Sequence, residues 1–144
     1  MKLKTFLFMV IAMLTIAFTS SSNEAKDLSG KWIIYSFDLN GEKQQLVVSD
    51  ITFEKQSDNS YSVNGYSGVN SYFGDVTISG TKIKPGTNFG STKMAGDPAS
   101  MTFEDNFLKC LTGATSAKLT NEDDTEFLEI KNNKDNSVLV FIRK

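Results

Sequence analysis

Short β-forming segments separated by turn signals recur along most of this chain. Within them, residues alternate in polarity or are mostly β-branched and aromatic. The segments are residues 31–37, 51–54, 61–64, 76–78, 82–84, 117–119, 126–130 and 138–142. Pairs such as Asn40-Gly41 and Ser79-Gly80 stand at the turns. Strands spaced at about 8–12 residues are typical of antiparallel barrels and sandwiches, and we expect one of these architectures.

One stretch breaks this pattern and predicts a helix. Asp97 is a suitable N-cap, Pro98 suits the first helical position, and Gly113 stands where a helix would end. Apolar residues recur between these signals at i, i+4 and i+8, namely Phe103, Phe107 and Leu111. We therefore expect one amphipathic helix over about residues 98–112, with its apolar face packed on the sheet.

The composition removes several classes of chemistry. The chain has no histidine, so it lacks the commonest general base, the commonest zinc ligand and any Ser-His or Cys-His pair. Its single cysteine, Cys110, excludes an intrachain disulfide and a cysteine-rich metal site. A formal net charge of -2 argues against nucleic-acid binding. We therefore expect no enzyme activity, no metal, no cofactor and no nucleic-acid partner.

The remaining candidates for chemistry favour structural roles. We expect Cys110 to be a small buried hydrophobe rather than a nucleophile, because no histidine can activate it. The acidic runs at 122–126 and 132–136 lack the spacing of a calcium loop, so we interpret them as solvated turns. Glu104 and Asp105 are neighbours on the predicted helix and point about 100° apart, so they cannot form an acid–base pair.

The first residues have the pattern of an export signal. Lys2 and Lys4 precede an apolar run over residues 5–18, and residues 20–24 are small or polar. This run is shorter than the roughly 20 residues that span a bilayer as a helix. We expect residues 1–21 to be a signal peptide and residues 22–144 to form a single exported domain, periplasmic or secreted. Serine stands where a lipoprotein carries its lipid-bearing cysteine, so we expect no lipid anchor.

Two blocks and both ends of the chain resemble the META domain, or HslJ-like heat-shock, family. The first block is residues 63–74, which contain Gly68, Asn70 and Gly74 around an aromatic pair. The second is residues 90–96, followed by Met101, Glu104, Phe107 and Leu111 in the helical stretch. Residues 28–32 and 139–143 are similar to the ends of the family domain.

The resemblance implies a mainly β fold, either an antiparallel lipocalin-like barrel or a strongly curved sheet with one packed helix. It also implies an envelope or secreted setting with links to stress responses, and no established enzymatic activity, cofactor or ligand. Many relatives carry cysteine at the positions of Val69 and Gly96. If those cysteines pair, this chain lacks the crosslink, and Val69 facing a small Gly96 would fit a site that has lost its bridge.

The family motifs suggest where a partner would bind. We expect a candidate recognition surface at Asn70, Tyr72, Thr92 and Lys93. We interpret the other motif residues as structural, and these are Trp32, Gly68, Gly74, Met94 and Glu104. The partner would be an envelope protein, or alternatively a small apolar ligand carried inside a barrel.

The barrel interior discriminates between these two partners. A cavity of several hundred Å³ would favour a ligand carrier. A filled core would favour a module that binds another protein. The side chains expected to fill it are Trp32, Phe53, Val76, Phe103, Phe107 and Phe141.

Overall fold

A computed structural model describes residues 27–143, so the predicted signal peptide lies outside the described residues. The first strands are β1 (Gly30–Leu39), β2 (Glu42–Lys43), β3 (Asp50–Lys55), β4 (Ser60–Tyr66) and β5 (Ser71–Ser79). They are followed by β6 (Lys82–Pro85), β7 (Gly90–Ser91) and the helix α2 (Pro98–Thr112). The last strands are β8 (Ser116–Glu122), β9 (Thr125–Asn132) and β10 (Ser137–Arg143).

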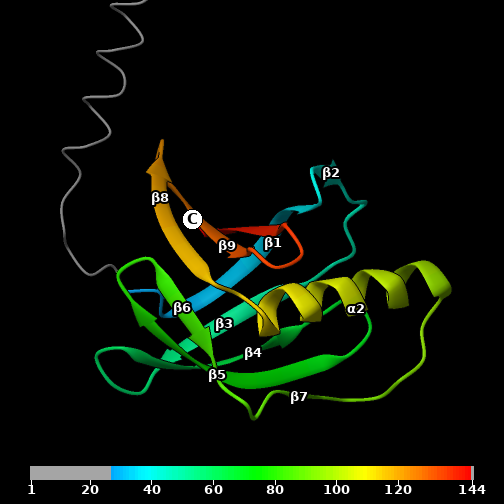
Figure 1. The fold of residues 1–144 in the computed structure, drawn as a ribbon, viewed down its shortest axis with the longest axis horizontal. Coiled ribbons are helices and arrows are strands. Elements are labelled where there is room, and N and C mark those ends of the chain that lie inside the picture. The colour runs from blue at the N-terminus through cyan, green and yellow to red at the C-terminus, as the bar shows by residue number, and fades with distance from the viewer. Residues whose placement is uncertain (1–26, 144) are drawn as a thin grey trace, which may run out of the picture.

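Within residues 27–143, the strands close into an antiparallel barrel of eight strands with one helix (Figure 1). Neighbours follow the order β10-β9-β8-β6-β5-β4-β3-β1, and β1 closes the ring by pairing with β10. The short strands β2 and β7 pair with β1 and β5 outside this ring. Of the two mainly β architectures that the resemblance implies, the structure shows the lipocalin-like barrel with one packed helix.

The turn chemistry explains the hairpins. Asn40 and Gly41 both have positive φ (53° and 83°), as a two-residue hairpin turn requires. Asp123 and Asp124 likewise have φ of 48° and 63° between β8 and β9. β1 carries a bulge between Ile34 and Ser36, which lets this strand bend between its partners.

The helix has the predicted boundaries. Asp97 caps it by accepting a hydrogen bond from the backbone N–H of Ser100 (3.0 Å). At the other end, the Asn132 side chain donates to the carbonyl of Lys109 (3.2 Å). A Cβ on Gly113 would lie 2.4 Å from Asn132 Nδ2, so glycine is needed here for close approach. The φ of Gly113 is -105°, outside the left-handed region.

The apolar face of α2 packs into the barrel. The fully buried ring of Phe107 contacts Tyr72 of β5 and Phe141 of β10, with ring centroids 5.7 and 6.1 Å away. These two strands are not neighbours in the barrel, so Phe107 fills space between separate walls. All six side chains expected in the interior are at most 6% exposed, namely Trp32, Phe53, Val76, Phe103, Phe107 and Phe141.

Arg143 links the last strand, β10, to the segment that precedes β1. Its guanidinium lies 4.1 Å from the ring centroid of Trp32 and donates to the carbonyls of Ser29 (2.6 Å) and Asp27 (3.2 Å). It also forms a two-point contact with the carboxylate of Glu126, at 3.1 and 3.0 Å. The segment that enters β1 is thus held by the end of β10.

Candidate functional site

Asn70 joins three segments of the fold through its side chain. It lies between β4 and β5 and is 3% exposed. Its Oδ1 atom accepts hydrogen bonds from the backbone N–H of Met94 (2.6 Å) and the hydroxyl of Thr92 (2.9 Å). Its Nδ2 atom donates to the carbonyl of Met94 (3.1 Å) and to Glu104 Oε1 (3.0 Å). The loop after β7 is therefore fastened to both the β4–β5 loop and α2.

Glu104 is a buried carboxylate on the inner face of α2. It is 3% exposed, whereas its neighbour Asp105 is exposed. Glu104 Oε2 accepts a hydrogen bond from the backbone N–H of Asn70 (3.1 Å). Such donors offset the cost of removing a carboxylate from water. As expected, the two neighbouring carboxylates point apart.

The Tyr72 side chain reaches from β5 across β4 to β3. Its ring is 2% exposed, and its hydroxyl donates to the carbonyl of Asp50 (2.8 Å). A Cβ at Gly65 would lie 2.2 Å from that carbonyl oxygen and 2.9 Å from the Tyr72 hydroxyl. Only glycine leaves room for this contact. Burial raises the pKa of Tyr72 well above its usual value of 10.0.

The four residues of the candidate recognition surface separate into two pairs. Asn70 and Tyr72 are buried, whereas Thr92 and Lys93 are exposed. The Thr92 hydroxyl donates a hydrogen bond to Asn70 and accepts one from the backbone N–H of Ser71 (3.2 Å). Its oxygen is therefore already hydrogen-bonded within the protein. A partner could therefore reach only Thr92 and Lys93 directly, while Asn70 and Tyr72 support the surface from below.

Val69 and Gly96 lie in contact beside this network. A Cβ on Gly96 would lie 2.7 Å from Val69 Cγ2 and 3.5 Å from Val69 Cβ. This contact is the arrangement that the family resemblance suggested. The methyl groups of Val69 occupy the space that a second side chain would need.

The motif glycines serve different purposes. Gly68 has a φ of +113°, which side chains rarely adopt. Gly74 lies in the middle of β5, and a Cβ there would lie 2.6 Å from the Phe89 ring. Gly74 therefore admits the Phe89 ring beside the strand and does not form a turn.

Sequence comparison assigns the family directly. The model of the META domain matches residues 26–144, which is 119 of the 144 residues. The chain belongs to the META-domain family. A comparison with curated proteins finds no match. The META domain is also similar in structure to a solved protein from Burkholderia xenovorans, with a TM-score of 0.66 and 19% identity. That likeness covers 87% of this chain and 95% of the other and shows a shared fold.

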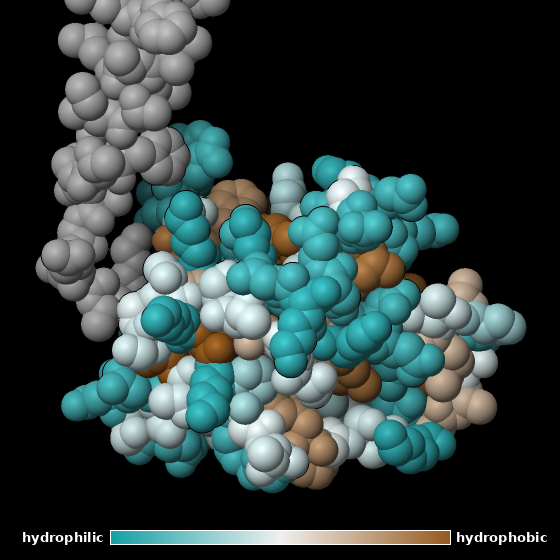
Figure 2. All heavy atoms as spheres, viewed as in Figure 1, coloured by the Kyte–Doolittle hydropathy of each residue, from teal (hydrophilic) through white to brown (hydrophobic). Residues whose placement is uncertain are grey.

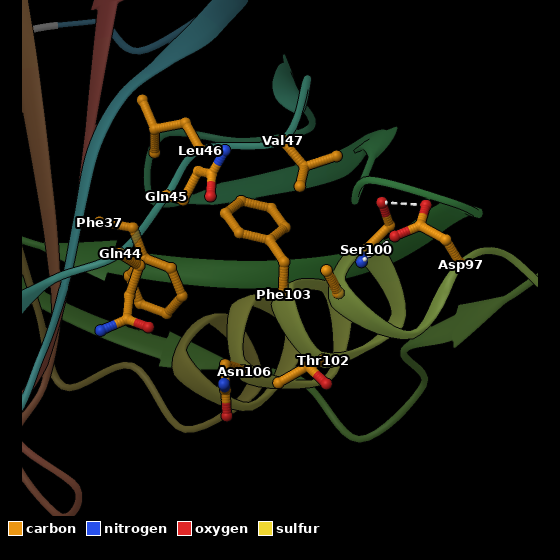
Figure 3. A pocket seen from close by; sticks show the side chains of 11 residues that line it. Phe37, Gln44, Gln45, Leu46, Val47, Asp97, Ser100, Thr102, Phe103 and Asn106 are labelled. Carbon is orange, nitrogen blue, oxygen red and sulfur yellow. Dashed lines mark hydrogen bonds between the residues drawn. The ribbon is translucent and has the colours of Figure 1, made fainter.

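The META domain also has an open groove that sequence reasoning missed. Figure 3 shows the segment after β2 lying opposite the first turns of α2. The groove measures about 450 Å³, with Phe37 and Phe103 at its base and Leu46 and Val47 on one wall. Polar side chains complete the lining, among them Gln44, Gln45, Ser100, Thr102 and Asn106. The segment over residues 44–47 has no regular structure, so its sequence gave no periodic signal.

Other candidate groups of the META domain are structural. Cys110 is fully buried, and burial raises its pKa to about 11. Asp135 is half-buried and accepts a hydrogen bond from the buried Ser137 hydroxyl, so it is less solvated than a simple turn residue. Within residues 27–143, no three His, Cys, Asp or Glu side chains gather as metal ligands would. Helix α2 is too short and too polar to cross a bilayer, and no other helix is described.

Proposed function

We propose that this protein is an exported, non-enzymatic META-domain module that binds another protein in the cell envelope and contributes to stress tolerance. The export pattern of residues 1–21 and the family membership support the setting. The absence of histidine from the whole sequence supports a role without catalysis.

The filled barrel interior is the observation that carries this proposal. Barrels that transport small ligands hold them in an internal cavity. Here the interior positions hold large side chains, and Trp32, Phe107 and Phe141 are fully buried. The barrel interior is therefore filled by side chains that stabilise the fold, and we expect a partner to bind on the outer surface.

The loop after β7 offers the best-defined surface for a partner. Asn70 holds its backbone at both the N–H and the carbonyl of Met94. The Met94 side chain is nevertheless 60% exposed, next to the exposed Lys93. Figure 2, in the view of Figure 1, shows a face covered largely by hydrophilic side chains, with hydrophobic ones scattered between them. A rigid loop that exposes an apolar side chain beside a charge binds with little ordering cost.

A capture experiment with matched variants tests this proposal. The purified mature domain would be immobilised and exposed to envelope extract of its host, and bound proteins identified by mass spectrometry. Met94→Ser and Lys93→Glu change the loop surface without touching the Asn70 hydrogen bonds, and Lys134→Glu is a distant exposed control. We expect a protein that the wild type and the control capture and that both loop variants lose. Equal capture by all four forms would contradict the proposed surface.

The groove between residues 44–47 and α2 supports a second candidate, a carrier of a small apolar ligand. Its volume of about 450 Å³ lies within the roughly 300–1,000 Å³ of small-molecule sites. Native mass spectrometry of protein purified from the host would detect a retained ligand. Loss of that mass in Phe103→Ala, but not in Lys134→Glu, would favour the carrier.

A further inference from the structure

The edge of β8 is paired for only part of its length. Lys82↔Ser116 is the single register pair that joins β6 to β8, and the Ala117 N–H donates to the carbonyl of Thr81 (2.8 Å). β8 continues to Glu122, and no strand among the described residues pairs with this edge over residues 118–122. Figure 1 shows β8 running away from β6.

The register with β9 determines which backbone groups face the open edge. The two-residue turn at Asp123 and Asp124 makes Glu122↔Thr125 a hydrogen-bonded pair. Backbone groups alternate along a strand, so those of Thr120 and Lys118 also face β9. The groups of Leu119 and Asn121 then face the open edge, on the same side as the Ala117 N–H.

The side chains along this edge are complementary to a second copy of themselves. Lys118 and Glu122 are both exposed and lie two residues to either side of Thr120. In an antiparallel pair centred on Thr120, Lys118 of each copy lies opposite Glu122 of the other. Leu119 then lies opposite Asn121, so the outward N–H and C=O groups of both copies meet. Opposite charges facing each other across strands stabilise a pair, whereas like charges destabilise it.

We propose that the protein self-associates by antiparallel pairing of β8 edges, with Thr120 on the two-fold axis. The inference is independent of the partner proposed above, because β8 lies outside the loop over residues 92–96. Charged residues often protect an open edge against any other strand. Here Lys118 and Glu122 lie at symmetric positions around Thr120. They therefore disfavour pairing with most other strands and favour pairing with the β8 edge of a second copy.

Analytical ultracentrifugation of the mature domain tests the proposal. Concentrations up to ~1 mM are needed, because small interfaces associate weakly. We expect wild type to change from monomer to dimer with rising concentration. Lys118→Glu places two glutamates on each edge and Glu122→Lys places two lysines, so each variant alone should dimerise at least tenfold more weakly.

A mixture of the two variants separates edge pairing from a structural effect. In a mixed pair, the glutamates at positions 118 and 122 of one variant face the lysines at these positions of the other. The equimolar mixture should therefore form a heterodimer, although neither variant dimerises alone. The double variant Lys118→Glu/Glu122→Lys should also dimerise like wild type. Thermal unfolding of each variant checks that it is folded. A monomeric wild type, dimeric single variants or a mixture that stays monomeric would each overturn the proposal.

Discussion

The side chain of Val69 lies against the backbone of Gly96, where a Cβ would be only 3.5 Å from Val69 Cβ. Disulfides join residues whose Cβ atoms are about 3.5–4.5 Å apart. The Cβ separation of a bridge is therefore present although neither residue is cysteine. Gly96 is also free of the positive φ that would exclude a side chain.

We predict that Val69→Cys/Gly96→Cys forms a disulfide without rearranging the loop. The crosslink should raise the free energy of unfolding by about 2–4 kcal/mol relative to the reduced form. Thiol titration and urea unfolding, with and without reductant, measure both effects. Buried Cys110, with its pKa near 11, should stay reduced. Gly96→Ala alone should destabilise, because its Cβ would lie 2.7 Å from a Val69 methyl group. A double variant that remains reduced under oxidising conditions would contradict the prediction.

The hydrogen bonds between Asn70 and Glu104 should be strongly coupled. Asn70→Ala removes the side-chain donor and leaves the carboxylate buried, which should lower the free energy of unfolding by about 3 kcal/mol. In a Glu104→Gln background the same change should cost less, since no charge is left unpaired. Urea unfolding of the wild type, both single variants and the double variant gives the coupling energy. Additive effects would show that the Asn70 side chain stabilises through Met94 and Thr92 and not through Glu104.

Phe107 should be the most sensitive packing position on α2. Phe107→Ala leaves a cavity between β5 and β10 and should cost about 3–5 kcal/mol, against a total stability of roughly 5–15 kcal/mol. Glu122, interpreted from the sequence as part of a solvated turn, is the exposed last residue of β8, and Glu122→Gln should cost within about 0.5 kcal/mol. Asp135→Asn should cost more than Glu122→Gln, because Asp135 accepts a bond from buried Ser137. Urea titrations of dilute protein compare them, and a Phe107→Ala variant as stable as wild type would mean that the helix is packed differently.

Asp97 should contribute to acid sensitivity. Hydrogen bonds from the hydroxyl and backbone N–H of Ser100 lower the pKa of Asp97 below its usual 3.8. The folded state therefore favours the ionised form, and its contribution is present above about pH 4 and lost as the pH falls further. Asn also caps helices but does not titrate, so Asp97→Asn should lose less stability between about pH 5 and pH 2. Hydrogen bonds from Ser29 lower the pKa of Asp27, which is present in both the wild type and Asp97→Asn. Both proteins should therefore keep some sensitivity to acid. Thermal unfolding across this range measures the difference, and parallel pH profiles would contradict it.

Local chemistry explains why much of the fold was predictable. The helix was found through Asp97, Pro98 and its apolar stripe, and the hairpins through turn pairs such as Asn40-Gly41. The two-residue strands β2 and β7 are too short to show periodicity and were missed. The structural role of Gly74 within β5 had no local signal, because the ring that it admits belongs to Phe89 on another segment.

The candidate site was harder to predict because its contacts are distant in sequence. Asn70 and Glu104 are 34 residues apart, and Tyr72 and Asp50 are 22 apart. Asn70 and Tyr72 both have polar atoms at the end of the side chain. Such residues occur on surfaces and also in buried positions where these atoms are hydrogen-bonded. The partners that bury them cannot be recognised from neighbouring residues.

The contacts of Arg143 have a consequence for the order of folding. This residue holds the carbonyls of Asp27 and Ser29 and stacks on Trp32, and it belongs to the strand that closes the ring on β1. Because β10 follows every other described strand in the sequence, a ribosome must release the chain as far as Arg143 before the barrel can close. Until then, the β1 edge lacks its β10 partner. A chaperone or translocation machinery that binds the growing chain therefore encounters an unpaired β1 edge.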